Sequence, residues 1–162
     1  ENVLRPIGMY IALSWAWEKF AKKNPKIKKR IVCDEAWMLT NPNMSGYQYT
    51  ADFLQTCARR ARKRNCALLC ASQNFKEFVA CPQGEAVLTN AGVNIFLKQA
   101  STDIDALQDK FKLSNGERSY LLSPRKGHFL LKMASEGTVG FAYSTDYEKY
   151  LIERHTIADG SL

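Results

Sequence analysis

Two adjacent carboxylates, Asp34 and Glu35, directly follow the apolar run Ile31-Val32-Cys33. Such a run is typical of a buried strand, and open α/β sheets bind their ligands at the carboxyl ends of the strands. At such a place one carboxylate can hold the Mg²⁺ that bridges two phosphates, and the next can orient and deprotonate an attacking water. The pair therefore suggests nucleotide hydrolysis with Asp34 as metal ligand and Glu35 as base, although two acids at a strand end can also merely cap the next helix.

Polar residues end two further strand-like runs. Ser72 and Gln73 end the run that begins at residue 66, and Lys98 and Gln99 follow the run 93–97. In a parallel sheet all three strand ends lie at one edge, where a phosphate-bearing ligand would bind. Gln73 would then lie beside the γ-phosphate, where its amide could bond phosphate or water and so sense the phosphate. The alternative is that Gln73 simply ends a strand.

Positive charge is concentrated in two clusters within a chain of net charge +7. Residues 22–30 hold six lysines and arginines, which we interpret as a solvated helix end, and residues 59–64 hold five more. Arg59 and Arg62 are three residues apart and share one face of a predicted helix. One of them could serve as an arginine finger on the nucleotide of a neighbouring subunit, because a guanidinium matches phosphate geometry. The alternative is a basic helix that faces solvent or DNA phosphates.

Length and composition are those of a globular protein. With 162 residues, 46% hydrophobic and 24% charged, we expect one domain over 1–162. The longest apolar run, 7–17, is too short for a membrane span and lacks the features of a signal peptide. Five cysteines without a CxxC pair suggest buried, reduced thiols of a cytosolic protein. His128 and His155 have no acidic or cysteine partner at catalytic or metal spacing, so we expect both to be structural or exposed.

The elements that must position these residues alternate between strand and helix. This alternation predicts an α/β fold with a mostly parallel sheet, covered by helices on both faces. A C-terminal antiparallel hairpin is expected at the edge of that sheet. The predicted strands are 29–33, 66–72 and 93–97; the predicted helices begin near Pro6 and cover 49–64, 84–90, 102–111 and 114–122; the hairpin joins 127–133 to 138–143, and a last helix starts at Thr145.

A phosphate-binding loop of the type GxxxxGK[ST] does not occur in the sequence. That loop supplies the backbone amides and the lysine that hold the phosphates in many nucleotide hydrolases. If the carboxylates are catalytic, the chain holds only half of a site. Because residue 1 is not methionine, we expect a fragment that begins downstream of such a loop, and therefore a partial domain.

The order of these segments resembles the carboxy-terminal part of the VirB4/TraC-type ATPases of type IV secretion and conjugation, within the HerA/FtsK group of RecA-like motors. The segment IVCDEAW (31–37) looks like that family's Walker B segment. RRARKRN (59–65) is similar to its arginine-finger helix, and LLCASQN (68–74) to its strand with a terminal glutamine. The stretch 113–121, followed by 127–131, resembles a later family segment, so the resemblance covers most of the chain.

The resemblance implies a RecA-like fold and a role for each segment. Asp34 would be the Mg²⁺ ligand, Glu35 the catalytic base, Gln73 the γ-phosphate sensor, and Arg62, or else Arg59, the finger. ATP and Mg²⁺ are the implied cofactors.

It also implies a cytoplasmic motor at the inner face of the cell membrane, hexameric when active. That motor would contact other components of the secretion channel, and DNA through its basic helix. Two other functions remain open. A DExx-type helicase lobe would carry a Ser-Ala-Thr-like motif where this chain has Ala71-Ser72-Gln73, which favours the secretion ATPase. A non-catalytic module that binds nucleic acid would use the basic helix alone.

Overall fold

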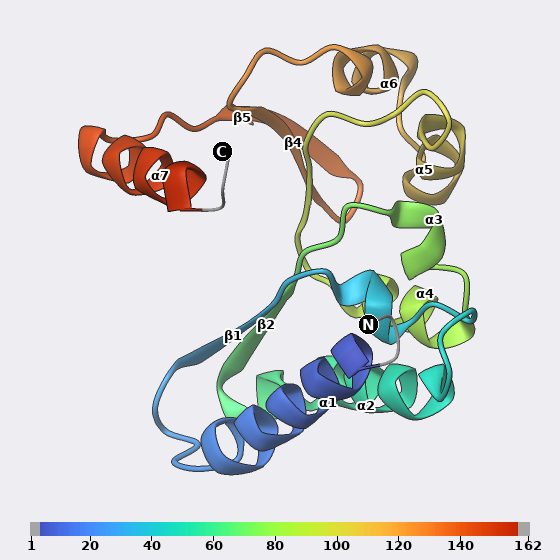
Figure 1. The fold of residues 1–162 in the computed structure, drawn as a ribbon. Helices are drawn as coiled ribbons and strands as arrows, with labels where there is room; N and C mark the ends of the chain where they lie inside the picture. The colour runs from blue at the N-terminus through green and yellow to red at the C-terminus, as the bar shows by residue number, and fades with distance from the viewer. Residues whose placement is uncertain (1–3, 159–162) are drawn as a thin grey trace. The chain divides into compact units, whose positions relative to one another are not determined.

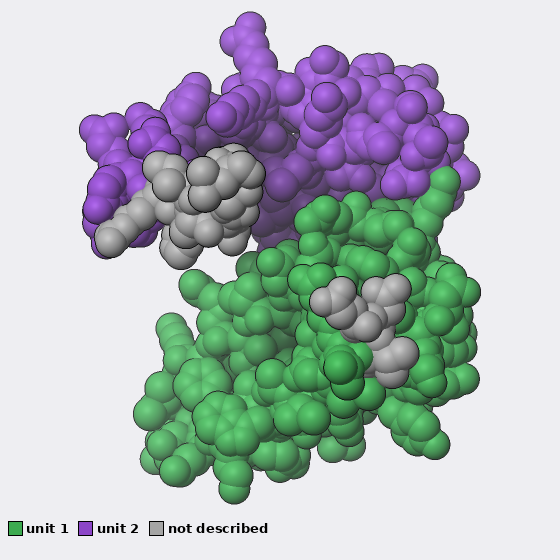
Figure 2. All heavy atoms as spheres, viewed as in Figure 1, with its two compact units in different colours: residues 1–92 green, residues 93–162 purple. Residues whose placement is uncertain are grey.

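The computed structural model describes the backbone of residues 4–158 and the side chains of residues 4–153, so the predicted role of His155 lies outside the described side chains. The chain divides into two compact units, residues 1–92 and 93–162 (Figure 2). Each is described by itself, and the single domain over 1–162 stays a prediction. None of the described helices is long and apolar enough to cross a membrane.

The first unit is an α/β unit built around a parallel strand pair (Figure 1). Its elements are α1 (Leu4–Ala16), the π-helical turn η1 (Trp17–Ala21), β1 (Lys29–Cys33), the 3₁₀ turn η2 (Ala36–Leu39), α2 (Tyr47–Arg60), the 3₁₀ turn η3 (Arg62–Arg64), β2 (Cys66–Cys70), α3 (Phe75–Phe78) and α4 (Pro82–Asn90). The register runs from Lys29 beside Cys66 to Cys33 beside Cys70. The parallel crossover through α2 confirms the predicted order of strand, helix and strand.

One face of this strand pair forms the core. Ile31 and Cys33 are buried against Trp17 of η1 and Leu54 of α2. Burial along β1 alternates, and Val32 on the opposite face is 62% exposed. Within residues 4–92 the helices cover one face of the pair, and coverage of both faces by helices of the whole chain stays a prediction. An apolar run does not by itself show that both of its faces are covered.

Lys29 does not belong to the solvated cluster that the sequence predicted for residues 22–30. Its side chain is buried, and its Nζ donates to the carbonyl oxygens of Ala21, Lys23 and Asn24 at 2.8, 2.6 and 3.0 Å. These carbonyls lie at and after the end of η1, where a helix leaves acceptors unpaired. Lys29 thus caps that helix end from the first residue of β1, and ties the two elements together.

The second unit contains an antiparallel sheet of strand order β3-β4-β5. Its elements are β3 (Asn94–Phe96), α5 (Ile104–Phe111), α6 (Asn115–Leu122), β4 (His128–Met133), β5 (Glu136–Phe141) and α7 (Asp146–Ala158). The hairpin β4-β5 is confirmed. The parallel strand predicted at 93–97 is wrong, because β3 pairs antiparallel with β4, with Asn94 opposite Lys132. The hairpin accordingly joins β3 and not the edge of the parallel pair; hydrophobic periodicity does not specify the partner of a strand.

A buried ion pair links α6 to β4. Ser114 and Glu117 form the predicted capping box of α6, with Ser114 N donating to Glu117 Oε2 at 2.8 Å. The other carboxylate oxygen accepts from Lys132 Nζ at 3.0 Å, and the Lys132 side chain is only 5% exposed. Burial alone would raise the pKa of Glu117. The hydrogen bonds from Ser114 and Lys132 outweigh it and hold this pKa below its ordinary value.

Candidate active site

The candidate site lies where β1 ends. Asp34 is exposed, and its Oδ1 accepts the backbone N–H of Glu35 at 2.9 Å. The backbone pairing continues beyond both strands: Ala71 N donates to Cys33 O, and Ala36 N to Ala71 O, both at 2.9 Å. The segments that follow β1 and β2 are therefore held side by side, which brings the residue after Asp34 close to the residues after Ala71.

Glu35 itself has a left-handed backbone, with φ 50° and ψ 40°. This region costs a residue with a Cβ about 1 kcal/mol or more, and persists only where surrounding bonds hold it. Here the hydrogen bond from Ala36 to Ala71 and the start of η2 supply that constraint. The turn ends β1 abruptly and leaves the Glu35 side chain half-buried at the strand end.

Both carboxylate oxygens of Glu35 accept a hydrogen bond. Gln73 Nε2 donates to Oε1 and Trp37 Nε1 donates to Oε2, each at 2.6 Å. The structure thus places Gln73 directly against Glu35, at the shared edge that the sequence predicted for the two strand ends. The hydrogen bond of Trp37 was not predicted, because an aromatic ring that follows a strand end is expected mainly to pack. The available signal was an indole N–H, which can only donate, two residues after a carboxylate.

Asp34 fits one kind of cation site. Among the described residues no group of three or more His, Cys, Asp or Glu could hold a metal ion. Mg²⁺, however, is commonly bound by one or two carboxylates together with substrate phosphates and water. One exposed carboxylate at a strand end suits that arrangement, and Asp34 Oδ1 is the oxygen engaged by the backbone.

The predicted arginine fingers lie at the other end of the strand pair. Arg59 lies in the last turn of α2 and Arg62 opens η3, and both side chains are exposed. The chain enters β2 just after them, beside Lys29, whereas Glu35 follows Cys33. Four residue steps of strand separate these ends, about 13 Å. Arg59 and Arg62 are therefore not grouped with Glu35 of the same chain.

The prediction that Lys98 and Gln99 end a third parallel strand is wrong. They follow β3, which belongs to the antiparallel sheet. The backbone N–H of Gln99 donates to Leu121 O at 2.9 Å, and its side-chain amide donates to Leu97 O at 3.1 Å. The Gln99 amide thus bonds to its own segment and has a local structural role.

The two basic clusters, distant in sequence, meet at that same far end. Lys29 N donates to Asn65 O at 2.9 Å, and the Asn65 side chain donates to Lys26 O at 3.3 Å. The loop with Lys26 and Lys28 is thereby joined to η3. No aspartate or glutamate occurs in 19–33 or in 53–76, which together hold most of the basic clusters. The result is one strongly positive end of the unit.

The cysteine thiols are unsuited to nucleophilic chemistry. Burial raises the pKa of Cys33 to about 11 and that of Cys57 and Cys70 to about 12. All five cysteines are free and none is exposed, as predicted. At neutral pH these three groups are protonated and contribute to packing.

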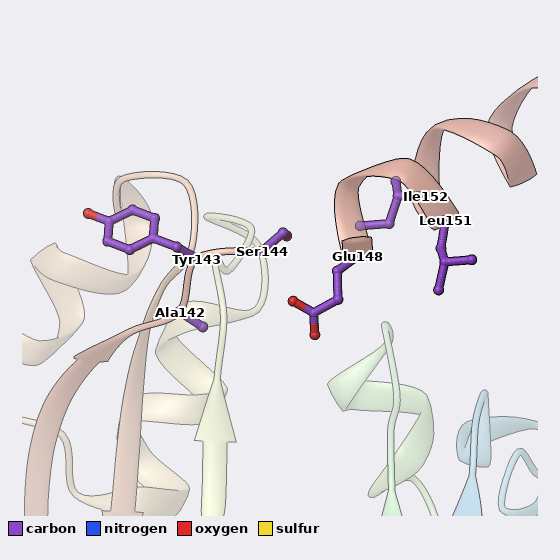
Figure 3. Close-up of a pocket in the computed structure, with 6 residues that line it drawn as sticks. All are labelled: Ala142, Tyr143, Ser144, Glu148, Leu151 and Ile152. Carbon is purple, nitrogen blue, oxygen red and sulfur yellow. The ribbon is translucent and has the colours of Figure 1, made fainter. Parts of the chain in front are cut away.

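A pocket of about 360 Å³ lies between the end of β5 and α7 in the second unit (Figure 3). Its lining comprises Ala142, Tyr143, Ser144, Glu148, Leu151 and Ile152. The Glu148 carboxylate already accepts the N–H and hydroxyl of Thr145, at 2.7 and 2.9 Å, and these bonds lower its pKa. No residue with a predicted chemical role lines this pocket, so the candidate site remains the end of β1.

Comparison with known proteins agrees with this geometry. No family model and no curated protein matches the sequence. Among solved structures, VirB4 of Thermoanaerobacter pseudethanolicus superposes with a TM-score of 0.80 and 27% identity, over 92% of this chain and 40% of that one. The genome packaging NTPase B204 from Sulfolobus turreted icosahedral virus 2, solved with ATP-gammaS, matches with a TM-score of 0.52 and 13% identity, over 85% of this chain and 59% of that one.

The likeness to the packaging NTPase shows the fold alone, whereas the likeness to VirB4 extends to the sequence. The chain spans about two fifths of that VirB4. The match over 92% of the chain supports the predicted resemblance and a partial RecA-like domain. In fold, and at 27% identity in sequence, this chain is similar to a fragment of a VirB4-type protein.

Proposed function

We propose that this chain is part of an ATP-hydrolysing motor of the type IV secretion and conjugation class. The observation that carries the proposal is the contact at the end of β1, where Glu35 and Gln73 meet at 2.6 Å beside Asp34. A base, an amide and a metal-binding carboxylate at one sheet edge are what phosphoryl transfer to water requires. The likeness to VirB4 supports this proposal, and the likeness to the packaging NTPase supports the fold on which it depends.

The roles of the residues follow from their positions. Asp34 would hold Mg²⁺, which neutralises charge on the β- and γ-phosphates when bound. Glu35 would orient the attacking water and take its proton. Gln73, with one amide hydrogen on Glu35, would sense the γ-phosphate. The phosphate-binding loop would come from a segment outside these 162 residues.

The proposal requires a second subunit. Arg62, or Arg59 close by, lies about 13 Å or more along the strands from Glu35 and is exposed. Either guanidinium could act on the ATP of a neighbouring copy, as an arginine finger supplied in trans. We therefore propose a ring of subunits, hexameric by the family resemblance. It would lie in the cytoplasm at the inner face of the membrane, in contact with other channel components.

Glu35→Gln tests the hydrolysis proposal in the intact protein. Phosphate release from ATP should fall at least about 100-fold while binding of a fluorescent ATP analogue persists, since the amide keeps the shape but cannot take a proton. Glu136→Gln is the matched control, because Glu136 is exposed in β5 of the other unit, and it should hydrolyse ATP normally. Unchanged turnover in Glu35→Gln would exclude Glu35 as the base.

The basic end of the first unit favours a second role, contact with the nucleic-acid backbone. Arginine matches phosphate geometry, and 58–67 holds four arginines and one lysine. We would measure how the logarithm of the binding constant for a fluorescent 30-nucleotide single strand falls with the logarithm of the salt concentration. Lys28→Gln combined with Lys63→Gln should lower the magnitude of this slope by about 1.4. The control, Lys98→Gln with Lys149→Gln, removes equal charge elsewhere and should leave the slope unchanged. Equal slopes in both variants would refute this contact.

A further inference from the structure

The two hydrogen bonds on Glu35 differ in how firmly they are held. Trp37 is half-buried and packs against the core of the first unit, within the 3₁₀ turn η2. Two backbone hydrogen bonds hold that turn: Met38 N donates to Glu35 O at 3.0 Å, and Thr40 N donates to Trp37 O at 3.1 Å. Gln73, by contrast, is exposed, in the segment between β2 and α3. The indole cannot turn away without disturbing the core, whereas the amide can.

We infer that Trp37 is a positioning residue for the general base: its indole N–H fixes Oε2 of Glu35, so that Oε1 is the oxygen that accepts the proton from water. This inference rests on the proposed function. A bond of 2.6 Å to an ionised acceptor is short and charge-assisted, and such bonds are about twice as strong as neutral ones. With Oε2 held, rotation of Gln73 frees Oε1 and leaves the carboxylate in place.

In the proposed reaction the two carboxylate oxygens of Glu35 have different tasks. As water attacks the γ-phosphorus, an O–P bond forms and the bond from that phosphorus to the bridging oxygen of ADP breaks. The proton lost by water goes to Oε1 of Glu35, which later returns it to the phosphate product. A carboxylate free to rotate would spend less time with an oxygen aimed at the water, and misplacement by 1 Å can cost about 100-fold in rate.

Trp37→Phe separates positioning from packing, because phenylalanine keeps an aromatic ring but has no N–H. In the intact protein we expect kcat to fall about 10- to 100-fold, the loss of one hydrogen bond to a charged group. The KM for ATP should stay within a factor of two or so, since the indole does not touch the nucleotide in this scheme. Trp15→Phe, an exposed indole in α1, is the matched control and should change neither of these.

A second variant covers the case in which Trp37→Phe folds poorly. Trp37→His restores a ring N–H and should recover part of the lost kcat, with rates expressed per ATP-binding protein. Wild-type kcat in Trp37→Phe, while Glu35→Gln is inactive, would overturn the positioning role but leave the hydrolysis proposal intact. An equal loss of kcat in Trp37→Phe and Trp37→His would also overturn it, because it would assign the loss to packing of the indole ring. An active Glu35→Gln would instead refute the proposed function.

Discussion

Replacing Lys132 by methionine should destabilise the second unit by about 2–4 kcal/mol, because it leaves a half-buried carboxylate without its cation. The Lys132 Nζ lies 3.0 Å from Glu117 Oε1, with side chains 5% and 20% exposed. Removing one partner of a fully buried pair costs about 3–5 kcal/mol. We expect a cost about 1 kcal/mol below that range because the pair is partly exposed and Glu117 keeps the hydrogen bond from Ser114 N. The Glu117 carboxylate lies against Gly137, opposite Lys132 in β5, where an added Cβ would lie 2.2 Å from Glu117 Oε1.

Urea unfolding followed by far-UV circular dichroism measures this loss. All three tryptophans, at positions 15, 17 and 37, lie in the first unit, so tryptophan fluorescence reports on that unit separately. A double-mutant cycle with Glu117→Gln isolates the pair. The pKa of Glu117 is lowered by folding, so its contribution is present above its unfolded pKa and lost as pH falls through the folded value. The difference between wild type and Lys132→Met should therefore shrink below about pH 4.5.

Additive single-mutant costs, with a coupling free energy below about 0.5 kcal/mol, would refute the ion-pair interpretation. A cost for Lys132→Met that stays constant from pH 7 to pH 3.5 would do the same, because it would assign the loss to packing of the lysine stem.

Three further changes test other parts of the structure. Gly84→Ala should cost about 3 kcal/mol and lower Tm, because its Cβ would lie 1.8 Å from the carbonyl oxygen of Phe78; an unchanged Tm would contradict the packing of α4. Lys29→Met should cost about 2–3 kcal/mol in urea unfolding by stranding three carbonyl oxygens; a neutral change would mean that water replaces the ammonium. Cys57 and Cys70 should react with iodoacetamide at pH 8 at least about 100-fold faster in urea than in the native protein; equal rates would contradict their burial.

Local chemistry was largely predictable from the sequence. Ser114 and Glu117 show the spacing of a capping box, and the structure contains it. The run before Asp34 predicted a strand, and the helical pattern between the two basic clusters predicted a parallel crossover, both of which are present. The capping box and the strand depend on residues within a few positions of one another, where backbone geometry is fixed by periodicity and capping, whereas the parallel crossover follows from the alternation of strand and helix.

Pairing over long distances was less predictable. The run at 93–97 is a strand, but its partner is β4 and its direction antiparallel. Apolar residues are compatible with either direction, so only the assembled sheet selects one. The sequence also showed two basic clusters without showing that Asn65 joins them.

The sequence by itself determined which groups are available: two carboxylates after a strand, a glutamine after the next, and arginines on the helix between. Only the tertiary structure decided how they are grouped. The parallel register brings the ends of β1 and β2 together, so Gln73 meets Glu35, and the same register keeps Arg62 at the opposite end. The tertiary structure also decided that the Trp37 indole donates a hydrogen bond to Glu35, because the left-handed backbone at Glu35 directly precedes η2 and brings the ring to the carboxylate.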